Sequence, residues 1–75
     1  MSQNSTAMWD DYPEVLTAKD VADLLRIGKN RAYELCKSQG FPAVRFGRSY
    51  RISKTLLLEW YQKQAKLGTE WNFID

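Results

Sequence analysis

The chain has 75 residues, enough for one small domain, and its net charge of +2 is small. Its single cysteine and its lack of histidine exclude an internal disulfide, a zinc cluster and imidazole-dependent catalytic pairs, so we expect no metal, no cofactor and no enzymatic activity. No apolar stretch approaches the roughly 18 residues of a membrane span, and the polar, acidic residues 1–11 do not resemble a signal sequence, which predicts a cytoplasmic protein without a membrane partner.

Positive charge is concentrated in the middle of the chain. Eight of the eleven Lys and Arg residues lie between Arg26 and Lys54, where Glu34 is the one acid, so this stretch carries +7. Residues 1–25 carry −4 and residues 55–75 carry −1. A small domain with one strongly positive face is suited to bind a polyanion, although the simpler alternative is a charged surface that keeps the protein in solution.

The two ends of the chain differ from its middle. Residues 1–15 are rich in Ser, Asn, Gln and Asp, which predicts a flexible arm, although Trp9 and Tyr12 offer a way to dock it. Residues 16–68 form the predicted domain. The C-terminal tail, residues 69–75, either folds back over the domain or docks on a partner, because it is too apolar for an idle segment. Its large apolar residues are Trp71, Phe73 and Ile74.

Two short helices are predicted at the start of the domain. Thr17 and Asp20 have the spacing of a capping box, and the apolar stripe that follows predicts a helix over residues 18–25. After a break of three residues, a second stripe predicts a helix over residues 29–38. Cys36 lies on this stripe and is expected to be a small core residue. The two helices therefore meet across a tight turn.

Alternating spacing over residues 43–52 predicts a β-hairpin. A two-residue turn would oppose Phe46 to Ser49, whereas a three-residue loop would oppose Phe46 to Tyr50. We favour the three-residue loop, because it places the apolar residues of both strands on one face. These residues are Val44, Phe46, Tyr50 and Ile52. The same register sets Arg45 against Arg51 on the outer face, a like-charge pair that costs stability unless an anion lies over it.

A third helix follows, capped by Ser53 and ending near Gly68. Its predicted inward face consists of Leu56, Leu57, Trp60 and Gln64. The order helix, tight turn, helix, hairpin, helix is that of a winged helix-turn-helix, in which the second helix enters the major groove and the hairpin follows the backbone or enters the minor groove. The predicted fold class is therefore α+β and mainly helical.

Several stretches together resemble a known family. Residues 16–25 (LTAKDVADLL), Tyr33 and residues 41–52 (FPAVRFGRSYRI) are similar to excisionase-type DNA-binding domains, which are related to MerR-like winged helices. The resemblance extends from residue 16 to about residue 62. The chain departs from the pattern at Gly28, where a serine cap is usual, and at Arg26, where a glycine usually takes the turn.

The resemblance implies candidate DNA contacts at matching positions. On the second helix, Asn30 and Arg31 would read bases, while Glu34 would accept from a cytosine amino group or pair within the helix. The implied phosphate contacts are Lys29, Tyr33, Lys37 and Lys54. The implied wing contacts are Arg48 at the tip, its neighbour Ser49, and Arg45 and Arg51 behind them. Tyr33 is equally suited to pack against the wing.

The resemblance also implies a role. Excisionase-type proteins bind double-stranded DNA and bend it beside a recombinase, so we expect a recombination directionality factor of a bacterial or phage mobile element, with a tyrosine-type recombinase (integrase) as partner. A small transcriptional regulator of a mobile element is the nearest alternative. A winged-helix protein-interaction module, in which Trp9 and the C-terminal tail bind a protein, is the alternative from another class. We expect a monomer in solution that binds repeated DNA sites cooperatively.

Overall fold

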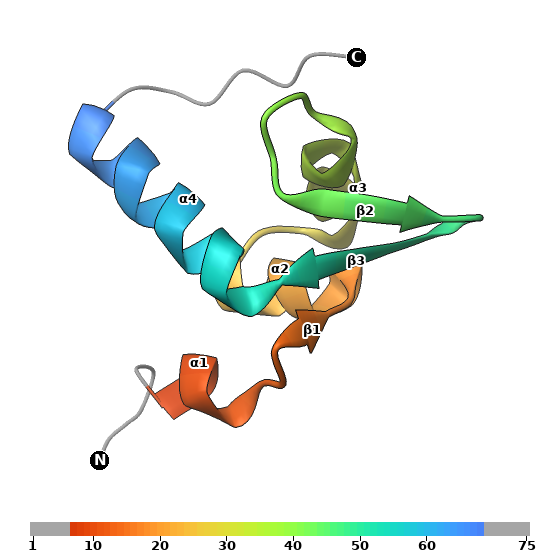
Figure 1. The fold of residues 1–75 in the computed structure, drawn as a ribbon, viewed down its shortest axis with the longest axis horizontal. Helices are drawn as coiled ribbons and strands as arrows, with labels where there is room; N and C mark the ends of the chain where they lie inside the picture. The colour runs from red at the N-terminus through yellow and green to blue at the C-terminus, as the bar shows by residue number, and fades with distance from the viewer. Residues whose placement is uncertain (1–6, 69–75) are drawn as a thin grey trace.

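The computed structural model describes residues 7–68, with side chains from Trp9 onward. Within these residues, helices surround a small antiparallel sheet (Figure 1). The elements are α1 (Ala7–Asp11), β1 (Val15–Leu16), α2 (Ala18–Leu25), α3 (Lys29–Lys37), β2 (Ala43–Phe46), β3 (Ser49–Ser53) and α4 (Lys54–Leu67). This is the mainly helical α+β winged helix-turn-helix that the sequence predicts. The C-terminal tail, including Trp71, Phe73 and Ile74, lies outside the described residues. Over residues 7–68, no helix combines the length and apolar character needed to cross a bilayer.

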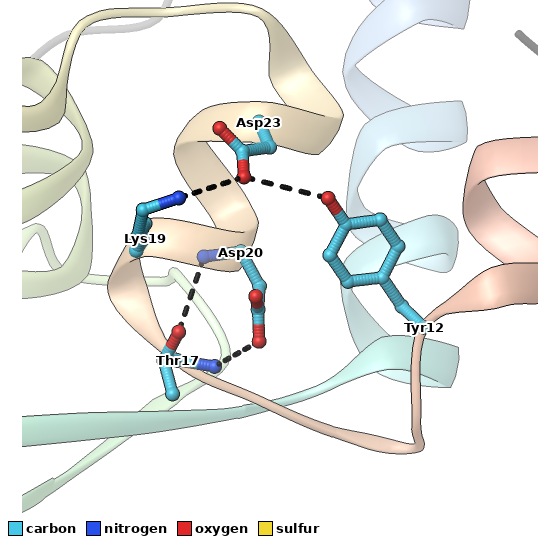
Figure 2. Close-up of polar contacts among 5 residues, drawn as sticks. All are labelled: Tyr12, Thr17, Lys19, Asp20 and Asp23. Atoms are coloured by element: carbon cyan, nitrogen blue, oxygen red, sulfur yellow. Dashed lines mark hydrogen bonds and ion pairs between the residues drawn. The ribbon is translucent and has the colours of Figure 1, made fainter.

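The capping box at the start of α2 is confirmed. The Asp20 backbone N–H donates to Thr17 Oγ1 over 3.1 Å, and the Thr17 N–H donates to Asp20 Oδ2 over 3.0 Å (Figure 2). Two backbone donors that the first turn would leave unpaired are thereby satisfied. The apolar side of α2 is buried, and the helix packs on α3 and on β3.

A tight turn joins α2 to α3. Arg26 adopts the left-handed conformation with φ of 58°, where the resembling family usually has glycine, at a cost of roughly 1–2 kcal/mol for a residue with a Cβ atom. The Ile27 N–H donates to Ala22 O over 3.0 Å and closes the end of α2. Gly28 provides no side-chain cap for α3. The turn is therefore held by backbone hydrogen bonds and by Ile27, which packs against the core.

The three-stranded sheet has the order β1-β3-β2, and its register corrects one prediction. Phe46 pairs with Ser49 and Val44 pairs with Arg51, so the hairpin has a two-residue turn and the predicted three-residue loop is wrong. Gly47 has φ of 62°, and a glycine with positive φ at the first turn position is typical of a type II′ hairpin. The preference of a two-residue turn for glycine at its first position therefore outweighs the pairing of apolar residues, on which the predicted three-residue loop was based.

The one-residue shift exchanges the two faces of β2 relative to the prediction. Val44 and Phe46 were expected to face the core, but they are 59% and 61% exposed. Arg45 pairs with Tyr50, so the predicted Arg45 and Arg51 pair on the outer face is absent. Of the four apolar residues expected on one face, only Tyr50 and Ile52 are buried.

The segment before α2 differs from the expected flexible arm. β1 pairs with β3, with Val15 opposite Ser53 and Leu16 opposite Ile52, and α1 lies beside the domain (Figure 1). Trp9 and Tyr12 pack against the core, which is the docking that their aromatic character allowed. The Tyr12 hydroxyl also donates to Asp23 Oδ2 over 3.4 Å, next to the Lys19 ammonium (Figure 2). Over its described part, the folded domain therefore starts well before residue 16.

The helix α4 begins and ends as predicted. Ser53 Oγ accepts from the Leu56 N–H over 3.2 Å, and Gly68 takes the left-handed conformation that ends the helix. Leu57 is fully buried, and Trp60 meets the ring of Phe41 edge-on with centroids 4.9 Å apart. Leu56 was expected on the inward face and is instead 50% exposed. It lies on the flank of a helix that makes few contacts with the rest of the domain.

Candidate nucleic-acid interface

The helix α3 presents a polar face and is held by an apolar one. Ala32, Leu35 and Cys36 are buried against the core, so the opposite side of the helix must face outward. The exposed candidate contacts on α3 are Lys29, Asn30, Arg31, Tyr33, Glu34 and Lys37. The helix ends at Lys37, one residue earlier than predicted, because Ser38 is extended and buried.

The amino-terminal half of α3 lines a shallow depression that continues into the turn before it. Its residues are Ile27, Gly28, Lys29, Asn30, Arg31 and Glu34. Gly28 has no side chain, and the position that a Cβ atom would take is open, so residue 28 does not cover the start of α3. The two candidate base readers, Asn30 and Arg31, therefore lie at an accessible helix end.

Arg31 and Glu34 form an ion pair along the helix, with 3.2 Å between Nη1 and Oε1. Their side chains remain 58% and 52% exposed, so the pair contributes only a few tenths of a kcal/mol. The intrahelical pairing considered for Glu34 is thus present in the structure.

Two contacts join α3 to the hairpin. The rings of Tyr33 and Tyr50 meet edge-on, with centroids 6.3 Å apart, so Tyr33 does pack against the wing. Near the end of α3, Lys37 and Arg45 line the same hollow, together with Cys36, Ala43 and Tyr50. Cations from two separate elements, Lys37 of α3 and Arg45 of β2, therefore lie beside one hollow.

The turn of the hairpin adds a further exposed cation. The Arg45 guanidinium donates from Nε to Gly47 O over 2.7 Å, which aligns the arginine along the turn. Arg48 occupies the second turn position and is exposed, as is Ser49 beside it. We call the exposed residues of α3 and the inner wing the reading surface. It comprises Lys29, Asn30, Arg31, Tyr33, Glu34, Lys37, Arg45 and Arg48, whereas Ser49 pairs with Phe46 and lies with it on the outer face of the sheet.

Besides Ser49, two predicted contacts lie away from the reading surface. Arg51 alternates with Tyr50 along β3 and pairs with Val44, so it lies on the outer face of the sheet, away from α3. The half-buried Lys54 ammonium donates to the backbone oxygens of Trp9 and Tyr12 over 3.0 and 2.7 Å. Its position gives Lys54 a structural role in docking the segment before α2.

Comparison with known proteins agrees with this architecture. A family model described as "Helix-turn-helix domain" matches residues 15–65, well over half of the chain. The protein belongs to this helix-turn-helix domain family. The matched residues include α2, α3 and the hairpin, and so contain every candidate contact from Lys29 to Lys54.

Two relatives of this helix-turn-helix protein come from Mycobacterium tuberculosis strains. They are named "Putative DNA-binding protein MT0521" (strain CDC 1551 / Oshkosh) and "Putative DNA-binding protein Rv0500A" (strain H37Rv), and each is 44% identical over 39 residues. The similar stretch covers 52% of this chain and 50% of each relative, so the chain matches about half the length of these proteins. No solved structure matches the helix-turn-helix protein significantly.

The chemistry of Cys36 fits a core residue of the helix-turn-helix protein. Burial raises the pKa of the Cys36 thiol to about 11, so the thiol stays protonated near neutral pH and is a poor nucleophile. Among residues 7–68, no group of three or more Cys, Asp or Glu residues is arranged to hold a metal ion.

Proposed function

We propose that this protein binds double-stranded DNA with sequence preference, placing α3 in the major groove and the hairpin turn along the adjacent backbone or minor groove. The observation that carries the proposal is the hollow shared by Lys37 and Arg45, which joins cations from two separate elements. A helix flanked by an extended ribbon matches the two grooves of a duplex. The DNA-binding names of the two relatives support the same class of ligand.

Base reading falls to the exposed start of α3. Asn30 offers an amide that can bond adenine, and Arg31 offers a guanidinium that can bond guanine through two hydrogen bonds. To do so, Arg31 leaves its exposed ion pair with Glu34, whose small free energy makes the exchange inexpensive. The remaining cations of the reading surface hold phosphates and fix the position of α3.

The charge available for phosphates sets the salt dependence. The reading surface carries five cations, whereas Arg51 and Lys54 are turned away from it. These five are Lys29, Arg31, Lys37, Arg45 and Arg48. If all five meet the duplex, the logarithm of the binding constant falls with the logarithm of salt concentration with a slope of about −4 to −5.

The biological role we propose is that of a recombination directionality factor, which bends DNA beside a tyrosine-type recombinase. The support is the resemblance of residues 16–25 and 41–52 to excisionase-type domains, together with the exposed Arg48 at the turn, where a cation can enter a narrowed minor groove. Bending would bring separated recombinase sites together.

The experiment is a binding selection from random duplexes, followed by titration at several salt concentrations and a bending measurement on the selected site. We expect a defined site, a slope near −4 to −5 and a bent complex. No binding, or binding without salt dependence, would contradict the proposal and favour a protein-interaction module. A straight complex at a promoter would keep DNA binding and replace the recombination role with regulation.

A further inference from the structure

The outer face of the sheet carries an apolar hollow that the reading surface does not use. Val15, Val44 and Phe46 contribute its apolar walls and are 60%, 59% and 61% exposed. We call this depression of about 350 Å³ the outer hollow. It is lined by Glu14, Val15, Val44, Phe46, Arg51, Ile52 and Ser53. Three large apolar side chains from two strands, gathered and exposed, are typical of a surface that binds another segment.

The charged residues that line the outer hollow indicate what kind of segment can bind there. Arg51 donates to its neighbour's backbone at Tyr50 O over 2.9 Å, and it meets no carboxylate among residues 7–68. Glu14 is committed to the domain, since its carboxylate accepts from Ser53 Oγ and Thr55 Oγ1 over 2.6 and 2.9 Å. The outer hollow is therefore suited to an apolar segment that also carries an acidic residue to pair with Arg51.

The chain itself contains such a segment. We propose that the C-terminal tail of a second copy of this protein docks in the outer hollow. The tail, TEWNFID, has three large apolar residues, two acids and no cation. Its aromatic residues match the apolar walls, and Glu70 or Asp75 can pair with Arg51.

Docking through Trp71 requires the tail of a second copy, because Trp71 lies too close to the end of α4 to reach the outer hollow of its own chain. The helix α4 has 14 residues, so it places Gly68 about 21 Å from Ser53 at the rim of the hollow. Figure 1 shows α4 leading away from the sheet on the side opposite the hairpin turn. Trp71 lies three residues beyond Gly68 and can reach at most about 11 Å. A tail that occupies the outer hollow through Trp71 therefore joins two molecules.

A face-to-face contact between two outer hollows is less favourable. A two-fold axis through the hollow would bring Arg51 near its symmetry mate while Glu14 remains committed to Ser53 and Thr55, which leaves like charges unpaired. A tail-into-hollow contact is instead heterologous and can repeat from one molecule to the next. Because the outer hollow faces away from α3, each molecule can hold DNA and a neighbour together.

The test uses sedimentation equilibrium of the full chain without DNA, so its outcome is separate from DNA binding. The hollow variant is Phe46→Glu, and the tail variant is Trp71→Ser with Phe73→Ser. The control is Leu58→Ser, since Leu58 is 39% exposed on α4 and does not line the hollow. Thermal unfolding of each variant confirms that the domain still folds.

We expect the average mass of the wild type and of the control to exceed that of a dimer as the protein concentration rises. The hollow variant and the tail variant should each stay monomeric alone, with association weakened at least about tenfold. When the two variants are mixed, the intact tail of the hollow variant can dock in the intact hollow of the tail variant. The mixture should therefore form a one-to-one dimer and no larger species. A mixture that stays monomeric, a tail variant that associates like the wild type, or a monomeric wild type would each overturn the proposal.

A charge exchange checks the pairing with Arg51. The Arg51→Glu variant should lose association, and the triple variant Arg51→Glu, Glu70→Arg, Asp75→Arg, in which every hollow and every tail carries the exchanged charge, should regain it. If the exchanged charges do not restore association while the first mixture does, Arg51 does not pair with the tail and the apolar contact alone holds the copies together. The expectation of a monomer then holds only at low concentration, and duplex DNA with adjacent sites would raise the local concentration of neighbours.

Discussion

The two faces of the sheet are built from the same strands, but one face is buried and the other is exposed. On the inner face, Leu16 and Ile52 are 0% and 1% exposed, whereas Val44 and Phe46 on the outer face are 59% and 61% exposed. Because strand side chains alternate, one register decides which residues build the core and which remain available for binding. In this protein, one face of the sheet contributes to the core that supports α3, and the apolar residues of the other face stay exposed.

The charges divide in the same way. Arg45 lies on the inner side, beside Lys37 of α3, and contributes to the reading surface. Arg51 lies on the outer side, beside Val44 and Phe46, and contributes to the outer hollow. Two arginines six residues apart in a conspicuously basic hairpin therefore serve different partners in our proposals. Substitutions at matched positions of the two faces test whether the faces have these different roles.

The largest difference concerns stability. Ile52→Ala removes a fully buried side chain and should lower the free energy of unfolding by about 2–5 kcal/mol, which includes the cost of the cavity. Val44→Ala, on the outer face of the paired strand, should change it by less than about 0.5 kcal/mol. Urea unfolding followed by circular dichroism measures both. Equal losses for the two variants would mean that the outer face is covered in the folded monomer.

Local signals predicted the helices well. The Thr17 and Asp20 capping box set the start of α2, and Ser53 and Gly68 set the two ends of α4, because these motifs satisfy nearby backbone groups without help from distant residues. The identity of the exposed α3 residues followed from helical periodicity. These features need only a few neighbouring residues, and so a single sequence contains them.

The hairpin register was predicted wrongly because two local rules disagreed. Pairing apolar residues favoured a three-residue loop, while Gly47 favoured a two-residue turn, and the turn prevailed. The apolar rule assumed that Val44 and Phe46 needed burial within the domain. Their exposure shows that the assumption fails on the outer face of this sheet.

The docking of the segment before α2 depends on contacts that span 39 to 45 residues. Lys54 donates to the backbone of Trp9 and Tyr12, and Glu14 bonds Ser53 and Thr55. No periodicity or short motif encodes such pairs. The resemblance implied a phosphate contact for Lys54, and the sequence contains no sign of the backbone partners that Lys54 has in the structure.

The second prediction concerns base reading at the start of α3. Asn30→Ala should relax preference at one position of the selected DNA site by about 1–3 kcal/mol. Lys29→Ala, one residue earlier, should weaken binding to all sequences alike and reduce the salt slope by about 1. Titration of the selected site and its single-base variants measures both. A uniform loss from Asn30→Ala would remove Asn30 from the base contacts.

The third prediction compares the two arginines directly. Arg45→Gln should lower DNA affinity by about 1 kcal/mol and reduce the salt slope by about 1, because it removes one phosphate contact from the reading surface. Arg51→Gln should leave both quantities nearly unchanged when measured at concentrations where the protein is monomeric. A mobility shift on a single site provides the comparison. If Arg51→Gln weakens binding as much as Arg45→Gln, the outer face also meets DNA.

The smallest effect is expected at the rim of the outer hollow and depends on pH. Hydrogen bonds from Ser53 and Thr55 hold the pKa of Glu14 below its ordinary value of 4.5. A carboxyl group whose pKa is lowered in the folded state stabilises the fold above its unfolded pKa, and this contribution is lost as pH falls through the lower folded value. Glu14→Gln should therefore lower the melting temperature slightly near neutral pH, and the difference from the wild type should shrink in acid below pH 4.5.

The matched control is Glu59→Gln on the exposed side of α4, which should show no such convergence. A difference that persists unchanged into acid would mean that Glu14 contributes through packing and that its charge does not anchor β1 to the start of α4.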